Sequence, residues 1–194
     1  MGVCIVSFSS RENGNCEEIG KYIGSFYNDT IKSFEFSEFT IEPCGKCSYE
    51  CFRNNSQCPY LNDKEYEIYD AITNSDLTYF IVPNYSDFPC ANFFIFNERS
   101  QCYFQKHPNR QNDYENVPKK FIVISNTGRE NFITAFTYHV SEAVTPNVLF
   151  LSAKFYNKSS IDGNILTSFE AKDDIKNFVL NTKPLYKNKE VGYE

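Results

Sequence analysis

Four cysteines lie close together in the first third of the chain. The 194 residues include eight cysteines, and four of them follow the spacing C-x2-C-x3-C-x6-C. These four are Cys44, Cys47, Cys51 and Cys58. Thiolates at such spacing can hold one compact soft centre, either zinc or an iron–sulfur cluster. One crowded segment, in place of two separated C-x-x-C hooks, favours a cluster. The alternative without metal is a set of free buried thiols, or disulfides formed on oxidation.

A second candidate site is the polar segment that follows the apolar residues 3–8. Its side-chain donors and its glycine are Ser9, Arg11, Asn13, Gly14 and Asn15. A helix is expected to begin directly after them, and the N–H groups and dipole at a helix N-terminus attract an anion. The hydroxyl, the guanidinium and the amides add to that attraction. The segment therefore suits a phosphate group, although an ordinary strand–helix turn with good capping residues would look the same.

Two later segments place further polar and aromatic side chains after apolar runs. The first is PNYSDFPC, which contributes Pro83, Asn84, Tyr85, Ser86 and Phe88. The second is SNTGRE, which contributes Ser125, Asn126, Thr127 and Gly128. Aromatic rings could lie against a flat ligand ring, and the amides and hydroxyls could bind its edge. The alternative for the first segment is a proline-bounded loop with buried aromatic residues. If all these segments leave parallel strands, they surround one crevice at the carboxyl ends of the sheet.

Other nucleotide and hydrolase motifs are absent from the sequence. There is no G-x-x-x-x-G-K-[ST] loop and no G-x-G-x-x-G fingerprint. The two histidines, His107 and His139, are far apart and are interpreted as incidental, which weakens any histidine-dependent hydrolase hypothesis.

The elements that must position these residues alternate along the chain. Buried or alternating apolar runs predict strands at residues 3–8, 31–41, 77–83, 121–125 and 148–151. Helical periodicity predicts helices after residue 15 and at 63–75, 91–101, 131–144 and 169–181. Asn15 with Glu18 is a plausible capping pair for the first helix. Residues 43–62 and 106–120 are expected to be loops, and 182–194 a polar tail. Strict alternation indicates one α/β domain, residues 1–181, with a parallel sheet covered by helices on both faces.

Composition narrows the class of protein. Hydrophobic residues make up 41% and the formal net charge is −6, so we expect a folded globular protein that does not bind nucleic acid. No run approaches the 18 apolar residues of a membrane span, and the first residues lack the basic region of a signal peptide. We therefore expect a cytoplasmic protein without a membrane partner.

Taken together, these segments resemble the flavodoxin-like NADPH-dependent FMN reductases, and more narrowly the iron–sulfur flavoproteins. Residues 9–16 are similar to the family pattern S-x-R-x-x-G-N-T, with Cys16 in place of the phosphate-binding threonine. The four-cysteine loop ends at Asn62-Asp63, where the family has an acidic pair. Pro83-Asn84-Tyr85 is similar to the Pro-x-Tyr flavin loop, and Glu98-Arg99 stands where the family has Asp-Arg. Two departures are one extra residue between Cys47 and Cys51, and Phe93-Phe94 in place of Leu-Lys.

The resemblance implies a fold and cofactors. It implies a five-stranded sheet of order 2-1-3-4-5, FMN held by residues 9–16, 83–88 and 125–128, and a 4Fe-4S cluster on the four cysteines. The implied activity is electron transfer between FMN and a cluster or ferredoxin-type partner, with NAD(P)H as a possible donor. A cluster-free NAD(P)H-dependent FMN or quinone reductase is the alternative. A non-catalytic flavodoxin-like binding or sensor protein with a zinc or thiol site is an alternative of another class.

Assembly is also implied. Members of the family form homodimers or homotetramers, and the aromatic residues Phe88, Phe93, Phe94 and Phe96 suggest an apolar patch that a second subunit covers.

Overall fold

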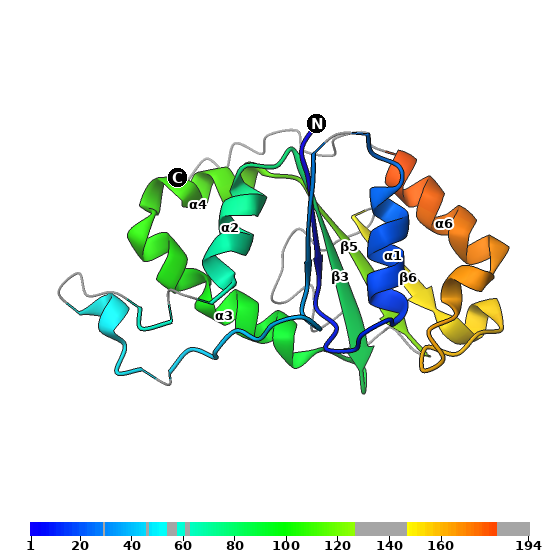
Figure 1. Ribbon diagram of the computed structural model, residues 1–194, viewed down its shortest axis with the longest axis horizontal. Coiled ribbons are helices and arrows are strands. Elements are labelled where there is room, and N and C mark those ends of the chain that lie inside the picture. The colour runs from blue at the N-terminus through cyan, green and yellow to red at the C-terminus, as the bar shows by residue number, and fades with distance from the viewer. Residues whose placement is uncertain (29, 46, 54–57, 61–62, 127–146, 182–194) are drawn as a thin grey trace, which may run out of the picture.

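A parallel β-sheet lies between two layers of helices (Figure 1). The computed structural model describes residues 1–28, 30–45, 47–53, 58–60, 63–126 and 147–181. Five strands run parallel: β1 (Val3–Ser7), β2 (Ile31–Glu35), β3 (Leu77–Tyr85), β5 (Lys119–Ser125) and β6 (Val148–Ser152). Their order across the sheet is β2-β1-β3-β5-β6. The two-residue β4 (Phe88–Pro89) pairs antiparallel with the end of β3.

The central strands form because both of their faces are buried. Every residue of β1 and β5 is buried, as are the first seven residues of β3, and their runs of Val, Ile and Phe match that environment. Successive side chains point to opposite faces, so Ile5 joins one core cluster and Val6 the other. The register places Val6 beside Phe34 of β2 and Phe80 of β3.

Each face of the sheet has its own helices. One face packs against α1 (Asn15–Gly24) and α6 (Phe169–Leu180), which contribute Ile19, Ile23 and Ile175 to its core. The opposite face packs against α2 (Glu65–Thr73) and α3 (Ala91–Lys106), with α4 (Pro108–Asn116) beside them (Figure 1). Short 3-10 helices lie at η1 (Glu50–Phe52), η2 (Ala153–Tyr156) and η3 (Ile165–Thr167). No helix in the described ranges is long and apolar enough to cross a membrane.

The described strands and helices follow the predicted alternation, with four differences, of which the helix α4 is described in the next paragraph. The sheet has an additional short strand, β4, so its order reads 2-1-3-5-6 and not 2-1-3-4-5. If β4 is left out and the five parallel strands are numbered on their own, the order is the expected one. Strand β2 ends at Glu35, well before the predicted residue 41. The first helix takes Gly14 as its N-cap, without a side-chain cap, because Asn15 is buried inside the first turn. The helix predicted at 131–144 lies outside the described residues, as does the tail at 182–194.

The predicted long loop at 106–120 was wrong, because most of it is α4. Pro108 occupies the first turn, where its missing N–H costs nothing and its fixed φ suits a helix. None of the nine residues of α4 is fully buried. The helix therefore needs no apolar stripe in its sequence, and such a stripe is the pattern by which helices are recognised. Tertiary contacts hold the helix instead: Arg110 donates to Thr73 and Asn74 on α2, and the Tyr114 ring packs on Tyr69.

Candidate functional site

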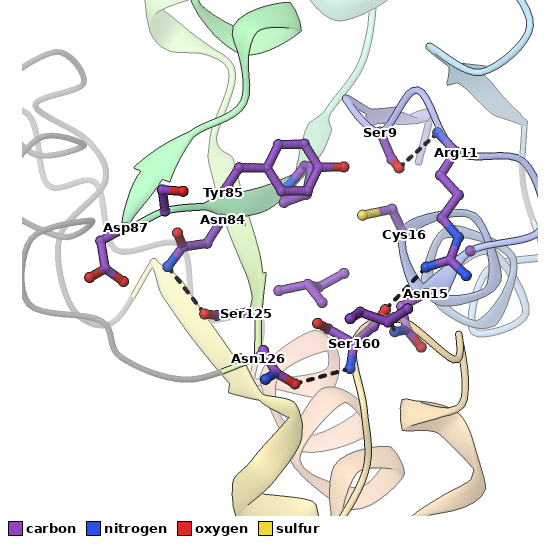
Figure 2. A pocket seen from close by; sticks show the side chains of 15 residues that line it. Ser9, Arg11, Asn15, Cys16, Asn84, Tyr85, Asp87, Ser125, Asn126 and Ser160 are labelled. Carbon is purple, nitrogen blue, oxygen red and sulfur yellow. Dashed lines mark hydrogen bonds between the residues drawn. The ribbon is translucent and has the colours of Figure 1, made fainter.

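A pocket opens where β1, β3 and β5 end. Its volume is about 390 Å³, which lies in the range of small-molecule sites. Four segments line it: the loop after β1 with the start of α1, the β3–β4 turn, the end of β5, and residues 160–161 (Figure 2). The carboxyl edge of an open parallel sheet is where such folds bind ligands.

The N-terminal end of α3 holds the loop that follows β1. The Asn92 amide donates to the carbonyl of Phe8 and to the Ser10 hydroxyl, both at 2.9 Å. The Cys90 thiol donates to the same Phe8 carbonyl at 3.3 Å. Ser9 is buried, and its hydroxyl accepts from the backbone N–H of Arg11 at 3.1 Å. These contacts fix the path of the chain into α1, so the helix N-terminus faces the pocket.

Asn15 joins this loop to a segment far along the chain. Its side-chain oxygen accepts from the backbone N–H of Ile165 at 2.9 Å, and its amide donates to the carbonyl of Ser160 at 3.1 Å. Arg11 reaches the same carbonyl at 3.5 Å. Gly163 has φ +66 and lies close to the loop after β1. A Cβ at this position would come within 3.4 Å of the Asn13 carbonyl oxygen. Residues 160–161, held in place by these contacts, therefore form one wall of the pocket.

Asn84 and the β3–β4 turn form the opposite wall. The Asn84 amide donates to the Ser125 hydroxyl at 3.2 Å, whereas its buried side-chain oxygen has no hydrogen-bond partner among the described residues. Ser86 and Asp87 both have positive φ, as the tight hairpin between Tyr85 and Phe88 requires. This turn places the Asp87 carboxylate across the pocket from Arg11 (Figure 2).

Burial sets the protonation of two side chains in the pocket. Burial raises the pKa of the Cys16 thiol far above its ordinary value, and nearby Cys90 adds to the effect while the Ser9 hydroxyl opposes it. Cys16 is therefore a neutral thiol at physiological pH. Burial also raises the pKa of Tyr85, again against an opposing effect of Ser9. Both side chains can act as hydrogen-bond donors, and neither is poised to act as a base.

Most of the predicted site residues meet in this pocket. Those that line it are Ser9, Arg11, Gly14, Asn15, Cys16, Pro83, Asn84, Tyr85, Ser86, Ser125 and Asn126. Asn13 and Phe88 do not line it: Asn13 turns its N–H to the Glu17 carboxylate, and Phe88 is exposed on β4. Thr127 and Gly128 lie outside the described residues.

Four lining residues were missed by sequence reasoning. They are Asp87, Ile124, Ser160 and Ile161. Ser160 and Ile161 belong to the polar segment that leaves the last strand, and the rule applied to the three earlier strands would have indicated that segment too.

The predicted metal cysteines lie in a different part of the molecule. Cys44, Cys47 and Cys51 are partly exposed, Cys58 is buried, and all four are free thiols. In the described parts of the chain, no group of three or more potential ligands is arranged to hold a metal ion. The geometry therefore does not support the predicted cluster. A fifth cysteine that the sequence analysis did not include, Cys102 on α3, places its sulfur 3.7 Å from that of Cys51.

A buried arginine anchors this cysteine-rich region. Arg99 on α3 is fully buried; it pairs with Asp63 and, at 2.8 Å, with Glu65. It also donates to the carbonyls of Glu42 and Tyr60 and, at 3.8 Å, to the sulfur of Cys58. Burial raises the pKa of Glu65 to about 8; Arg99 opposes this shift and Asp63 reinforces it. One cation thus lies beside two carboxyl groups, and burial still raises the pKa of Glu65 above its ordinary value.

The predicted apolar patch was largely wrong. Phe93 and Phe96 are buried in the core, Phe94 is partly buried, and only Phe88 is exposed. Aromatic side chains fill the space between the sheet and α3. The centroid of the Phe8 ring lies 5.2 Å from that of Phe93 and 5.5 Å from that of Phe96. The expected homo-oligomer stays a prediction, without the surface argument first given for it.

Comparison with known proteins identifies the fold. No family model matches the sequence, and no curated protein matches it. Among solved structures, RosB with a bound riboflavin-5'-phosphate derivative matches with a TM-score of 0.66 and 10% identity over 94% of this chain and 77% of that chain. This chain has the same fold as RosB. The Trp repressor binding protein of Bacillus subtilis matches with a TM-score of 0.60 and 11% identity, covering 91% and 96% of the two chains. An NAD(P)H:quinone oxidoreductase from Methanothermobacter marburgensis matches with a TM-score of 0.54 and 15% identity, covering 89% and 97%.

Proposed function

We propose that the chain is an FMN-dependent oxidoreductase that takes electrons from NAD(P)H and passes them to a small acceptor such as a quinone. The observation that carries the proposal is a single pocket whose two ends differ in chemistry. One end has the N-terminus of α1, Ser9 and Arg11, and the other has Tyr85, Ile124 and Asn84. A phosphate suits the first end and a planar ring suits the second, as FMN requires.

The residues present fit FMN in three ways. The first backbone N–H groups of α1 have no acceptor within their own helix and favour an anion. The Arg11 side chain donates to one carbonyl among the described residues, which leaves guanidinium N–H groups to bind a phosphate. The buried side-chain oxygen of Asn84, which has no hydrogen-bond partner within the described ranges, suits an N–H donor on the ring edge. Bound FMN would supply the hydride and electron chemistry. The protein would orient the ring and exclude water.

Two solved structures of the same fold add support. RosB binds a riboflavin-5'-phosphate derivative, and the protein from Methanothermobacter marburgensis is named as an NAD(P)H:quinone oxidoreductase. A reductase without an iron–sulfur cluster agrees with the pocket and with these names. The cysteine-rich region lies on the far side of α2 and α3 from α1 and the pocket (Figure 1), so the proposal assigns it no part in this reaction.

The test begins with the apo-protein and FMN. Titration followed by flavin fluorescence should give saturable binding at one site per chain. Under anaerobic conditions the FMN-loaded protein should then oxidise about one equivalent of NADH or NADPH per flavin on its own, and more than that only when a quinone is present. Binding without turnover would support the sensor alternative. Failure to bind FMN would overturn the proposal.

An arginine pair sharpens this test. Arg11→Ala should weaken FMN binding by about 1.5–3 kcal/mol, the range for a hydrogen bond to a charged group. Arg53→Ala is the matched control, because Arg53 is exposed and lies outside the pocket. Equal affinities in the two variants would contradict the phosphate assignment.

A further inference from the structure

Two thiols meet where η1 packs against α3. Cys102 is buried on α3, and its thiol donates to the sulfur of Cys51 in η1 at 3.7 Å. A disulfide needs a sulfur–sulfur distance of about 2.05 Å, so the two atoms must approach by about 1.7 Å. Cys51 belongs to a three-residue 3-10 helix, a short element that can shift more readily than α3. The pair is thus placed for bond formation.

We propose that Cys51 and Cys102 are a redox-active dithiol that closes to an internal disulfide when it meets a small-molecule disulfide. The two cysteines come from segments 51 residues apart in sequence, so the bond would fasten the cysteine-rich region to α3. This inference does not depend on FMN or on the proposed reductase activity.

The reaction proceeds by two exchanges. The Cys51 thiol loses its proton and attacks the small disulfide RSSR, which forms a Cys51–SR mixed disulfide and releases one RSH. The Cys102 thiol then loses its proton and attacks the Cys51 sulfur, which releases the second RSH. Two thiols are oxidised by two electrons, and one RSSR is reduced to two RSH.

The order of attack follows from exposure. Cys51 is partly exposed, whereas Cys102 is 2% exposed and cannot meet a bulky disulfide directly. Cys102 therefore acts second, once its neighbour Cys51 has become a mixed disulfide.

The other cysteines are less well placed. Cys58 is 3% exposed, and Arg99 holds its sulfur at 3.8 Å from the guanidinium. Cys4, Cys16 and Cys90 are buried beside the sheet, away from η1.

The test uses the full chain, first reduced and then incubated with oxidised glutathione. Thiol titration after denaturation should show that two of the eight thiols are lost. Tryptic mapping should link residues 47–53 to residues 100–106. Because Cys47 and Cys51 share the first peptide, Cys47→Ser serves as the matched control and should form the same linked pair.

Cys102→Ser separates the two steps. This variant should stop at one glutathione adduct on Cys51 and form no internal bond. Retention of all eight thiols in the wild-type chain would overturn the proposal. So would an internal bond that joins Cys44 to Cys47 or Cys58 to Cys102, or one that still forms in Cys102→Ser. The wild-type peptide map decides the matter even if the variant does not fold.

Discussion

Two arginines, Arg11 at the pocket and Arg99 beside the cysteine-rich region, have opposite surroundings. Arg11 is exposed beside a pocket and makes one long side-chain hydrogen bond to a loop carbonyl. Arg99 is fully buried, pairs with two carboxylates and donates to backbone and sulfur around it. The pocket keeps donors and acceptors available, whereas the cysteine-rich region uses them internally. Changes in the first region should therefore alter ligand binding, and changes in the second should alter stability.

The largest expected effect comes from Arg99→Met. The variant would leave Asp63 and Glu65 buried without their cation, and breaking a buried pair in this way costs about 3–5 kcal/mol of unfolding free energy. Urea denaturation measures the loss. Arg110→Met is the control, because Arg110 is partly exposed, with a surface pair to Asp113 at 3.8 Å and hydrogen bonds to Thr73 and Asn74, so its loss should cost less, about 1–2 kcal/mol. A loss equal to that of the control would erase the contrast between buried and exposed arginines.

The pH dependence of stability should come next. The pKa of Glu65 is about 8 in the folded chain, against an ordinary value of 4.5. Between these values the folded chain holds a proton that the unfolded chain has released. Stability should therefore fall as pH rises through this window, by at most about 1.4 kcal/mol per pH unit. Glu65→Gln keeps the neutral form and should flatten the profile in urea denaturation. An unchanged slope in this variant would refute the raised pKa.

In the pocket, Asn84→Leu should separate binding from stability. Removing the amide takes away a hydrogen bond to the flavin ring, so FMN affinity should fall by about 1 kcal/mol. The unfolding free energy should fall by no more than about 1 kcal/mol, because the amide loses one hydrogen bond, to the Ser125 hydroxyl, and the side-chain oxygen has no partner to lose among the described residues. Fluorescence titration and urea denaturation of the same samples give both quantities. A large loss of stability with unchanged FMN affinity would assign Asn84 to the structure and not to the site.

The smallest effect should come from the hairpin turn. Asp87 has φ +64, where a side chain is strained and glycine is not. Asp87→Gly should raise the unfolding free energy by about 0.5 kcal/mol, since the relief of strain slightly exceeds the added chain entropy. Thermal unfolding should show a small rise in midpoint. A fall would show that the carboxylate stabilises the turn by more than its strain.

The pocket was predictable and the anchoring of the cysteine-rich region was not, for a physical reason. Loops at the carboxyl ends of parallel strands converge whatever their detailed contacts, so the strand pattern alone brought Ser9, Tyr85 and Ser125 together. The partners of Arg99 depend on which face of α3 is buried and on where a loop without sequence periodicity folds back onto α3. No sequence pattern marks either of these. Cys102 was set aside for the same reason, because its place beside Cys51 is a tertiary contact without a sequence pattern. The helix α4 was missed because it is held by contacts with α2 and has no apolar stripe of its own.

The contacts of Asn15 also bear on the order in which the molecule is made. Asn15 leaves the ribosome well before its partners Ser160 and Ile165, which lie 145 and 150 residues later. Contacts of such long sequence separation carry a large loop-closure entropy and form late. The wall formed by residues 160–161 is thus completed only after residue 165 has been synthesised. A nascent chain stopped before this segment would carry the sheet core without the finished pocket, so ligand retention would report that synthesis has passed residue 165.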